Sequence, residues 1–324
     1  MSDELWMERC LDLAALGAGH VSPNPMVGAV LVYQGRIIGE GYHREIGGPH
    51  AEVQAIASVK PNDRHLLPDA TLYVNLEPCC HQGRTPPCTN LILEQSIPKV
   101  VAATEDPSAK VSGKGLGILR EHGVSVQTGV LENEALWLNR RFIIFHQEHR
   151  PYVILKWAQS ANGFMGRAGE RVKISAPITD RLVHKWRAEE DSILIGTNTA
   201  KTDNPHLTVR LWPGRSPLRA VVDTSNSLPR SAHLFSEEAE TIVLHHREPS
   251  EMMAALFDRE VLSVMVEGGA MLLGSFIRAG LWDEARVIVS PMRMDDGVAA
   301  PVLPVTPMQQ PSGPDQIHYF RNEH

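Results

Sequence analysis

The sequence predicts two α/β domains that follow each other along one chain. The chain has 324 residues, which is more than one hydrophobic core ordinarily serves. Strand-like and helix-like segments alternate through both halves, as they do in layered α/β proteins. A polar stretch, Gln147 to Pro151, separates the halves, and a new apolar run begins immediately after it. We therefore expect one domain at residues 1–147 and a second at residues 151–324.

Alternating hydrophobic patterns in the first half predict a sheet covered by helices. Gln34-Gly35 supplies the turn of a hairpin between two apolar runs. The expected elements, in chain order, are a helix at 3–17, hairpin strands at 27–33 and 36–41, a helix at 51–59, a strand at 71–76, a helix at 87–96, a strand at 100–104 and a helix at 113–122. This order is typical of an α/β layered domain.

Apolar runs in the second half predict a largely parallel sheet, because helical patterns separate several of them. The expected strands are 152–156, 192–195, 219–222, 241–244 and 264–266, and the expected helices are 177–190 and 270–279. A stretch rich in proline and glutamine, from Pro301 to Pro314, predicts a loop near the C-terminus.

Composition and charge narrow the class of function. Hydrophobic residues make up 43% of the chain and charged residues 21%, which is typical of a soluble globular protein. The net charge of -7 argues against a nucleic-acid partner, since phosphate binding needs a basic surface. No apolar run is long enough to span a membrane. The first residues do not resemble a signal peptide and the chain has only four cysteines, so we expect a cytoplasmic protein.

The motif that carries chemistry is His50-Ala51-Glu52, followed by Pro78-Cys79 and later by Cys88. One histidine and two cysteines can hold Zn²⁺ and leave its fourth position open for water. A carboxylate that does not bind the metal can move a proton from that water to a departing amine. The motif therefore predicts zinc-assisted hydrolytic deamination, with His50, Cys79 and Cys88 as ligands and Glu52 as proton shuttle.

Local sequence supports a shared site. Residues two apart on a helix face away from each other, so His50 and Glu52 can meet only if His50 lies at or before the helix cap. Pro86-Pro87 predicts that Cys88 begins a helix. There are two alternatives to a shared zinc site. His50 and Glu52 could form an ordinary surface pair, and Cys79 and Cys88 could form a disulfide. Two cysteines lie outside the motif: Cys10 is expected in the core, and Cys80 as a free thiol.

A second feature lies where a predicted strand meets a helix, at Glu267-Gly268-Gly269-Ala270. Glycines at such a junction let backbone amides approach a phosphate group at the start of the helix. A tight turn without a ligand is the alternative reading of the same residues. The chain has no G-x-G-x-x-G, so a Rossmann dinucleotide domain is not predicted.

Several strings together resemble one enzyme family, the bifunctional riboflavin-biosynthesis deaminase/reductases. The resemblance covers nearly the whole chain and is carried by 23–28, 39–43, 49–52, 75–88, 195–199, 203–210 and 266–269. It implies a cytidine-deaminase-like three-layer domain followed by a dihydrofolate-reductase-like domain. It also implies Zn²⁺ and NADPH as cofactors, a phosphorylated pyrimidine as substrate, and a homo-oligomer (dimer or tetramer).

The resemblance implies two reactions. The first domain would hydrolyse the exocyclic amine of a diaminopyrimidinone that carries a phosphoribosylamino group, and the second would reduce its ribosyl group to ribityl. Eight residues separate Cys79 from Cys88, whereas base deaminases commonly carry P-C-x-x-C. A nucleic-acid base deaminase is therefore disfavoured. We expect the longer loop to contact the substrate phosphate, and the predicted deaminase substrate residues are Asn24, His43, His81, Arg84 and Thr85. For each of them the alternative is a solvated loop residue or a cap.

For the second domain the resemblance assigns one set of residues to NADPH and another to substrate. The expected cofactor residues are Ala158, Lys173, Thr199, Asp203, Thr224, Gly268, Gly269 and Ala270. The expected substrate residues are Lys156, Arg171, Arg187, Leu207, Arg210 and Glu267. Arginine suits a phosphorylated sugar because it forms bidentate contacts. The alternative to substrate binding is an ordinary charge, on a helix surface for Arg187 and at a strand end for Arg210.

The chain departs from the family pattern at three positions in the second domain. Asn162 replaces the aspartate of S-x-D-G, and Arg171 and Lys173 replace a serine and a tryptophan. Asparagine tolerates the same turn geometry as aspartate. Arg171 and Lys173 would either contact the cofactor's phosphates or weaken the reductase half. The alternative function is therefore a deaminase whose second domain binds NADPH or substrate without turnover.

Overall fold

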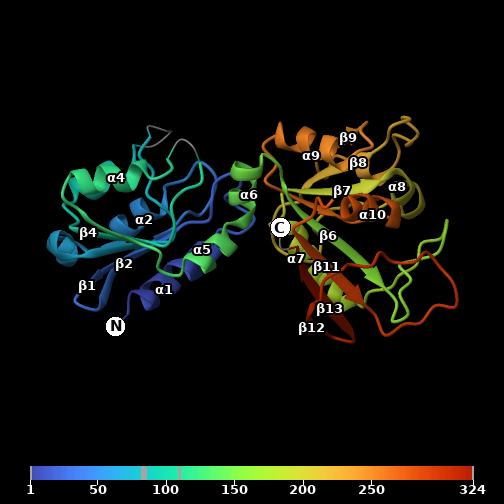
Figure 1. Cartoon of the computed structure of the whole chain (residues 1–324), viewed down its shortest axis with the longest axis horizontal. Helices are drawn as coiled ribbons and strands as arrows, with labels where there is room; N and C mark the ends of the chain where they lie inside the picture. Colours follow the sequence, from blue (N-terminus) through green and yellow to red (C-terminus); the bar gives the residue numbers. More distant parts are fainter. Residues whose placement is uncertain (1, 82–85, 109–110, 323–324) are drawn as a thin grey trace. The chain divides into compact units, whose positions relative to one another are not determined.

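The computed structural model describes residues 2–81, 86–108 and 111–322, and the chain forms two units, Met1–Glu148 and His149–His324 (Figure 1). The division between the units falls inside the polar stretch at 147–151. Among the described residues, no helix combines the length and apolar character that a membrane crossing requires. Each unit is described on its own below.

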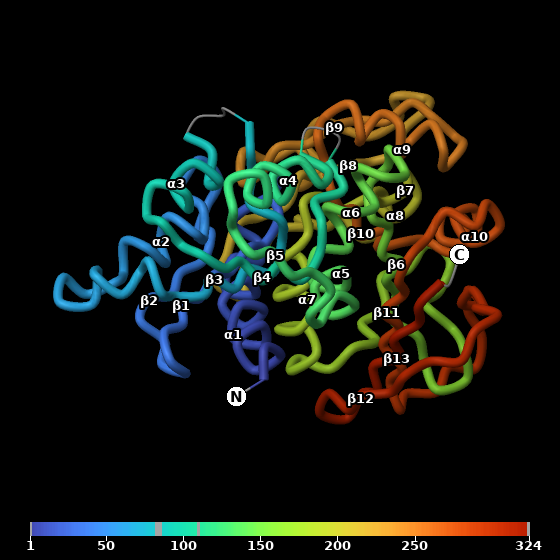
Figure 2. The backbone as a smooth tube through the Cα atoms, turned by 60° about the vertical axis from the view of Figure 1, so that its left-hand side comes forward, coloured from blue at the N-terminus to red at the C-terminus, as the bar shows by residue number. Residues whose placement is uncertain are grey.

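The first unit is built on a five-stranded sheet in the order β2-β1-β3-β4-β5. Its strands are β1 (Gly28–Tyr33), β2 (Arg36–Tyr42), β3 (Thr71–Val74), β4 (Lys99–Ala102) and β5 (Ser125–Thr128). β1 is antiparallel to β2 and β3, whereas β3, β4 and β5 are mutually parallel and lie side by side in Figure 2. Gln34 and Gly35 both have positive φ, 49° and 74°, as a tight hairpin turn requires.

Alternate residues of β1 face two different cores, so the first unit has three layers. Ala29 and Leu31 pack in the core that contains residues of α2 (Ala51–Ser58), α3 (Cys88–Glu94) and α4 (Lys114–Glu121). Val30 and Val32 pack on the opposite face with α1 (Asp3–Ala15) and α5 (Glu132–Leu138). This alternation is that of a strand buried on both faces. A 3₁₀ helix (η1, Pro61–Asp69) and α6 (Arg140–Glu148) complete the unit.

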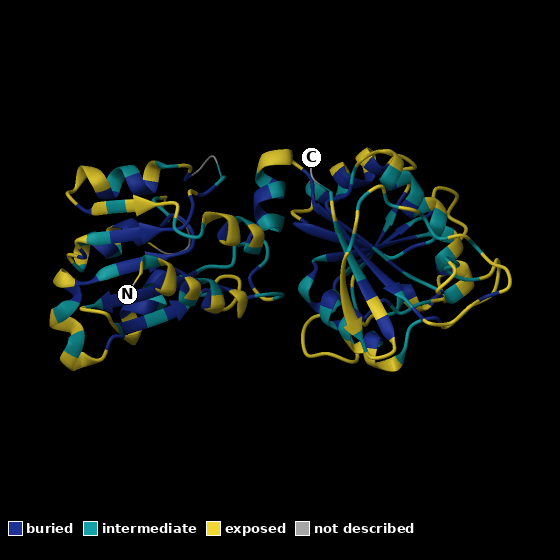
Figure 3. Cartoon of the chain, turned by 60° about the horizontal axis from the view of Figure 1, so that its bottom comes forward, coloured by how far each residue is buried: buried dark blue, intermediate teal, exposed yellow. Residues whose placement is uncertain are grey.

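The second unit contains an eight-stranded sheet in the order β12-β13-β11-β6-β10-β7-β8-β9. The six strands from β11 to β9 in this order are parallel, and β13 and β12 are antiparallel additions at one edge. The strands are β6 (Tyr152–Gln159), β7 (Ser192–Gly196), β8 (Leu218–Val222), β9 (Thr241–Leu244), β10 (Ser263–Val266), β11 (Glu284–Val289), β12 (Met308–Ser312) and β13 (Asp315–Arg321). Figure 3 shows the central strands as largely buried.

Helices connect the parallel strands of the second unit and cover the sheet. They are α7 (Pro177–Glu189), α8 (Thr197–Asp203), α9 (Pro249–Phe257) and α10 (Ala270–Arg278), with a short 3₁₀ helix, η2, at His233–Phe235. Val153, Leu155 and Val264 pack with residues of α9 and α10 in one core. In open parallel sheets, ligands bind outside the carboxyl ends of the strands. The segments that begin at Thr197 and Glu267 lie at these ends, after β7 and β10.

One sequence prediction about the fold is wrong. The stretch from Pro301 to Pro314 is not entirely a loop, because Met308–Ser312 forms β12 and pairs with β13. Pro311 lacks a backbone N–H, but β12 is the edge strand of the sheet, where proline is tolerated. The proline and glutamine content that predicted a loop therefore reflects an exposed edge.

Candidate metal centre and buried ionic site

Three potential metal ligands meet in the first unit: His50, Cys79 and Cys88. His50 is the cap residue of α2, Cys79 follows β3, and Cys88 is the first residue of α3 after Pro87. The Nδ1 atom of His50 lies 3.3 Å from Cys88 Sγ and 3.4 Å from Cys79 Sγ. The ligand atoms of all three residues lie within 4.8 Å of one another. The structure thus brings the three predicted ligands into one cluster.

This cluster fits Zn²⁺. Tetrahedral zinc with ordinary bond lengths separates its nitrogen and sulfur ligands by about 3.6 Å and two sulfurs by about 3.8 Å. The two N–S distances lie within a few tenths of an ångström of that value. All four cysteines of the chain are free, so Cys79 and Cys88 do not form a disulfide. Cys10 is fully buried, as predicted.

The cluster also favours a charged thiolate beside a buried carboxyl group. Hydrogen bonds from the Cys88 thiol and from His50 lower the pKa of Cys79 to about 4. Glu52 lies in the first turn of α2 and is only 3% exposed. Burial raises the pKa of Glu52, and the negative charge of Cys79 raises it further. A carboxyl group with a raised pKa can both accept and return a proton near neutral pH.

Asn24 and His43 form a bridge to the loop that carries His50. The Asn24 amide lies 3.1 Å from His43 Nε2, and His43 Nδ1 lies 3.1 Å from the carbonyl oxygen of Pro49. Burial lowers the pKa of His43, which is therefore neutral, with Nδ1 donating to Pro49 and Nε2 accepting from Asn24. The His43 and His50 rings meet edge to face at 5.6 Å. These two predicted substrate residues thus lie beside the metal cluster.

The remaining predicted deaminase residues lie in the loop between the two cysteines. His81 is exposed, and Arg84 and Thr85 lie outside the described residues. Sequence reasoning missed Asp106, a buried residue that follows β4. Burial raises the pKa of Asp106 to about 6, and charges on Glu77 and Cys79 add to this, while His81 opposes it. A carboxyl group of that pKa close to Cys79 is a further candidate for contact with substrate.

Glu77 is a second residue that sequence reasoning missed. Its buried carboxylate accepts hydrogen bonds from the backbone N–H groups of Asp106, Gly113, Gly115 and Leu116, at 2.8 to 3.2 Å. Three of these donors lie at the start of α4, where an anion is favoured. A Cβ on Gly115 would lie 2.2 Å from the carbonyl oxygen of Pro78, so this backbone approach requires glycine. Glu77 therefore fastens α4 and the Asp106 segment to the chain that carries Cys79.

We expect Glu77→Gln to destabilise the first unit by about 3 kcal/mol, because an amide N–H₂ would replace an oxygen that accepts from buried N–H groups. The deaminase activity predicted from the sequence should fall together with stability. Denaturant unfolding of the whole chain measures the first effect, and Glu105→Gln, an exposed carboxylate in the loop after β4, is the matched control. Equal unfolding midpoints for the two variants would contradict this account of Glu77.

A buried ionic cluster occupies the second unit at the carboxyl end of β10. Arg187 on α7 forms a bidentate pair with Glu267, with both N–O distances 2.8 Å. Lys156 on β6 lies 3.5 Å from the same carboxylate. Burial alone would raise the pKa of Glu267, but the charges of Arg187 and Lys156 outweigh it and lower that pKa to about 2. Burial also lowers the pKa of Lys156.

The segment after α8 supplies the neighbouring wall of this cluster. Arg187 Nη1 donates to the carbonyl oxygen of Thr208 at 3.4 Å, and Arg210 donates to the Thr208 hydroxyl at 2.8 Å. The backbone N–H of Arg210 donates to Nδ1 of His184 at 3.0 Å. Four of the predicted substrate residues, Lys156, Arg187, Arg210 and Glu267, are thus linked by contacts. Leu207 is only 3% exposed, so its side chain is buried rather than open to a ligand.

Comparison with known proteins identifies the family. Residues 1–104 match the family model of the cytidine and deoxycytidylate deaminase zinc-binding region, and residues 151–306 match that of the RibD C-terminal domain. The riboflavin biosynthesis protein RibD of Aquifex aeolicus is 38% identical over 321 residues, which cover 92% of this chain and 89% of that protein. The Escherichia coli protein of the same name is 35% identical and covers 90% of this chain. The chain belongs to the RibD family.

Solved structures of RibD proteins agree with this assignment. A deaminase/reductase from Thermotoga maritima is 34% identical, with a TM-score of 0.90 and 98% of each chain covered. RibD of Acinetobacter baumannii is 30% identical, also with a TM-score of 0.90, and covers 99% of each chain. The predicted fold class is therefore confirmed: a cytidine-deaminase-like domain precedes a dihydrofolate-reductase-like domain.

Five of the eight residues expected to bind the cofactor follow β7 or β10: Thr199, Asp203, Gly268, Gly269 and Ala270. Gly268 has a φ of 131°, a conformation that favours glycine, and a Cβ on Gly269 would lie 3.2 Å from Thr199 Oγ1. Ala270 begins α10, a nine-residue helix. Burial raises the pKa of Asp203, at the end of α8, and the nearby charge of Arg171 opposes this. Ala158 lies on β6, and Thr224 is exposed just after β8.

Two of the three positions that depart from the expected family pattern, Asn162 and Lys173, have polar partners, whereas Arg171 is exposed. Asn162 accepts from the Ser160 hydroxyl at 3.0 Å and from the Met294 N–H at 3.1 Å, and it donates to the Met294 carbonyl oxygen at 2.8 Å. A carboxylate could not make that last bond, so the amide suits this turn. Lys173 is 62% exposed at its side chain and pairs with Asp180 on α7.

The environment of His184 leads to a prediction about pH. Burial and the charges of Arg187 and Arg210 lower the pKa of His184 to about 4, so the folded protein keeps it neutral. As pH falls from about 6.5 to about 4, His184 takes up a proton in the unfolded chain but stays neutral in the folded chain. The free energy of unfolding therefore decreases, by at most about 3 kcal/mol. His184→Asn retains an acceptor and does not titrate. Calorimetry of the second unit between pH 7 and pH 4.5 should therefore show a smaller loss for His184→Asn than for wild type; equal losses would contradict this.

Proposed function

We propose that this chain catalyses two successive steps of riboflavin biosynthesis on a small, phosphorylated pyrimidine. The first domain deaminates a diaminopyrimidinone that carries a phosphoribosylamino group, and the second reduces the ribosyl group to ribityl with NADPH. The observation that carries this proposal is the cluster of His50, Cys79 and Cys88 with Glu52 buried beside it. Membership of the RibD family over most of the chain supports both steps.

In the deamination, His50, Cys79 and Cys88 would hold Zn²⁺. The metal supplies Lewis-acid activation of a water molecule near neutral pH. Glu52 accepts the proton of the attacking water and delivers it to the departing amine, which leaves as ammonia. The Asn24–His43 bridge fixes the Pro49 carbonyl and keeps His50 oriented at the cap of α2. Asp106 and His81 would contact the polar groups of the pyrimidine, a role that the raised pKa of Asp106 supports.

In the reduction, the glycine pair after β10, together with Thr199 and Asp203, would hold NADPH. The cofactor supplies the hydride that reduces the ribosyl carbon. Lys156 and Glu267 would bind the ribosyl group and supply the proton that follows the hydride, and their ion pair at the end of β10 supports this role. Arg187 fixes Glu267, and Arg210 offers an exposed guanidinium to the phosphate.

A second domain that binds ligand without turnover is not favoured. Lys156 and Arg187 both pair with Glu267, so the predicted substrate cluster is present. Asn162 forms hydrogen bonds in the turn where the resemblance leads us to expect aspartate. The Thermotoga maritima protein, similar over nearly the whole chain, is a deaminase and a reductase in one polypeptide.

Product masses test the two-step proposal. The diaminopyrimidinone substrate should gain the mass of amine-to-carbonyl exchange without NADPH, and two further hydrogens when NADPH is added. Glu52→Ala should abolish the first change. A wild-type product that stops at the first change, whatever the NADPH concentration, would leave only the deaminase half of the proposal.

The resemblance also suggests a homo-oligomer, a dimer or tetramer, in the cytoplasm. Light scattering of the purified chain tests the oligomeric state, and fractionation of the source cells tests the location. A monodisperse monomer would remove the first expectation.

A further inference from the structure

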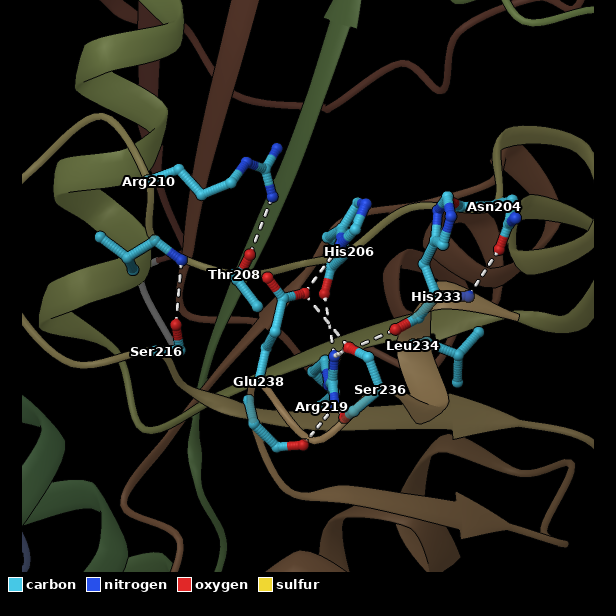
Figure 4. Close-up of polar contacts among 12 residues, drawn as sticks. Asn204, His206, Thr208, Arg210, Ser216, Arg219, His233, Leu234, Ser236 and Glu238 are labelled. Atoms are coloured by element: carbon cyan, nitrogen blue, oxygen red, sulfur yellow. Dashed lines mark hydrogen bonds and ion pairs between the residues drawn. The ribbon is translucent and has the colours of Figure 1, made fainter. Parts of the chain in front are cut away.

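Arg219 on β8 is fully buried. Its Nη1 and Nη2 atoms donate to neutral oxygen atoms from two loops, whereas its Nε atom has no hydrogen-bond partner among the described residues. Figure 4 shows the guanidinium enclosed by these loops. Nη1 donates to the carbonyl oxygens of His206 and His233, each at 3.3 Å, and to the Ser236 hydroxyl at 3.2 Å. Nη2 donates to the carbonyl oxygens of Ser236 and Ala239. One side chain thus joins the segment after α8 to the segment around η2.

This arrangement is unusual because buried cations are ordinarily paired with an anion. The described part of the chain offers Arg219 no ion pair. The carboxylate of Glu238 lies one step further out, where it accepts from the Ser236 hydroxyl at 3.2 Å. Charge neutralisation therefore does not explain the residue, whereas its backbone contacts do, since they fix the course of both loops.

Contacts on the outer side hold the same two segments together. The rings of His206 and His233 stack with centroids 4.1 Å apart and planes 19° apart. The His233 N–H donates to the Asn204 side-chain oxygen at 2.8 Å, and His206 Nδ1 lies 2.8 Å from Glu238. The segment 204–206 is therefore held from inside by Arg219 and from outside by side chains.

The residues directly after His206 reach the buried ionic cluster. Leu207 has a φ of 54°, a left-handed conformation that is strained for a residue other than glycine and persists only where its surroundings impose it. Arg219 holds the carbonyl group immediately before Leu207, and Arg187 holds the carbonyl group of Thr208 immediately after it. Leu207, whose backbone is constrained, therefore connects the carbonyl group bound by Arg219 to the one bound by Arg187.

We infer that Arg219 is a positioning residue for the reduction: it holds the 206–210 segment so that the exposed Arg210 side chain faces the phosphorylated substrate. This inference rests on the proposed function of the second domain. Arg219 itself is buried beneath the segment and touches neither substrate nor cofactor. Removal of the Arg219 side chain should shift the 206–210 segment, which contacts the substrate. The contacts of Gly268 and Gly269 after β10 should be unaffected.

The test is steady-state kinetics of Arg219→Met in the full-length protein. The value of kcat/KM for the reducible substrate should fall on the order of 10- to 100-fold, mainly through KM, as expected when a contact segment shifts by about an ångström. KM for NADPH should change little. Deamination by the same polypeptide, in the other unit, reports that the chain is intact and correctly quantified.

Arg150→Met is the matched control. Arg150 is also a buried arginine of the second unit, but it pairs with Asp283 at the amino end of β6, at the opposite end of the parallel strands. This variant should lose stability without a selective rise in substrate KM. If both variants lose stability and activity in parallel, with no KM difference between them, Arg219 is merely structural and the inference is overturned.

Arg219→Lys covers the case in which the methionine variant does not fold. Lysine keeps the charge and can reach one carbonyl group but cannot bridge the two loops. A folded lysine variant should show a raised substrate KM, and a wild-type KM in that variant would overturn the inference. Failure of the proposed function has a different signature: the wild-type protein itself would then show no NADPH oxidation with the deaminated substrate.

Discussion

Glu52→Gln should lower kcat for deamination by about 100- to 10,000-fold while the protein keeps its zinc and its reductase activity. Glutamine preserves the shape of the side chain in a site that is only 3% exposed, so packing around α2 should survive. It cannot accept the proton of water or return it to the leaving amine. The loss should therefore appear in kcat, with little change in substrate binding.

The control for this variant is Glu45→Gln, which replaces an exposed carboxylate in the loop that leads to His50. Ammonia release measures the deaminase rate, and metal analysis of both variants measures zinc. A Glu52→Gln protein with nearly wild-type turnover would remove Glu52 from the mechanism. A variant that had lost its zinc would instead assign the residue to metal binding.

Glu267→Gln should abolish most reduction and destabilise the second unit by about 3–5 kcal/mol. Loss of one partner from a buried ion pair leaves the remaining charge uncompensated, and here both Arg187 and Lys156 would lose their anion. The same change removes the group that aligns Lys156 at the end of β10. Stability and catalysis should therefore fall together.

Glu251→Gln, an exposed carboxylate on α9, is the control for this loss. Calorimetric melting of the second unit and NADPH oxidation with the deaminated substrate measure the two effects. Deamination should continue in the Glu267 variant at a temperature where the first unit stays folded. Melting of Glu267→Gln at the wild-type temperature would contradict the account of a mutually compensated cluster.

The metal ligands could be predicted as a group because their signals are local. Gly47-Gly48-Pro49 and Pro86-Pro87 mark the starts of α2 and α3, and Pro78 ends the approach from β3. A helix start or the end of a strand places a side chain at a defined point, so two helix starts and one strand end predicted one cluster. Most of the strands and helices followed from hydrophobic periodicity for the same reason.

The residues that sequence reasoning missed act through contacts between distant segments. Glu77 binds N–H groups that are 29 to 39 positions further along the chain, and nothing in its own neighbourhood predicts them. Arg219 lies in a strand that was predicted, but a single cation in an apolar run does not reveal which carbonyl groups surround it. Strand β5 was missed because its residues are mostly exposed and polar, so they lack a clear period.

Zinc content measured together with both activities tests the central claim most directly. The purified chain should hold one zinc per polypeptide, and exhaustive chelation should stop deamination while the reduction of already deaminated substrate continues. Readdition of zinc should restore the first activity, and Cys88→Ser should fail to recover it. Full deamination by a zinc-free protein would contradict the assignment of His50, Cys79 and Cys88 as the catalytic metal site.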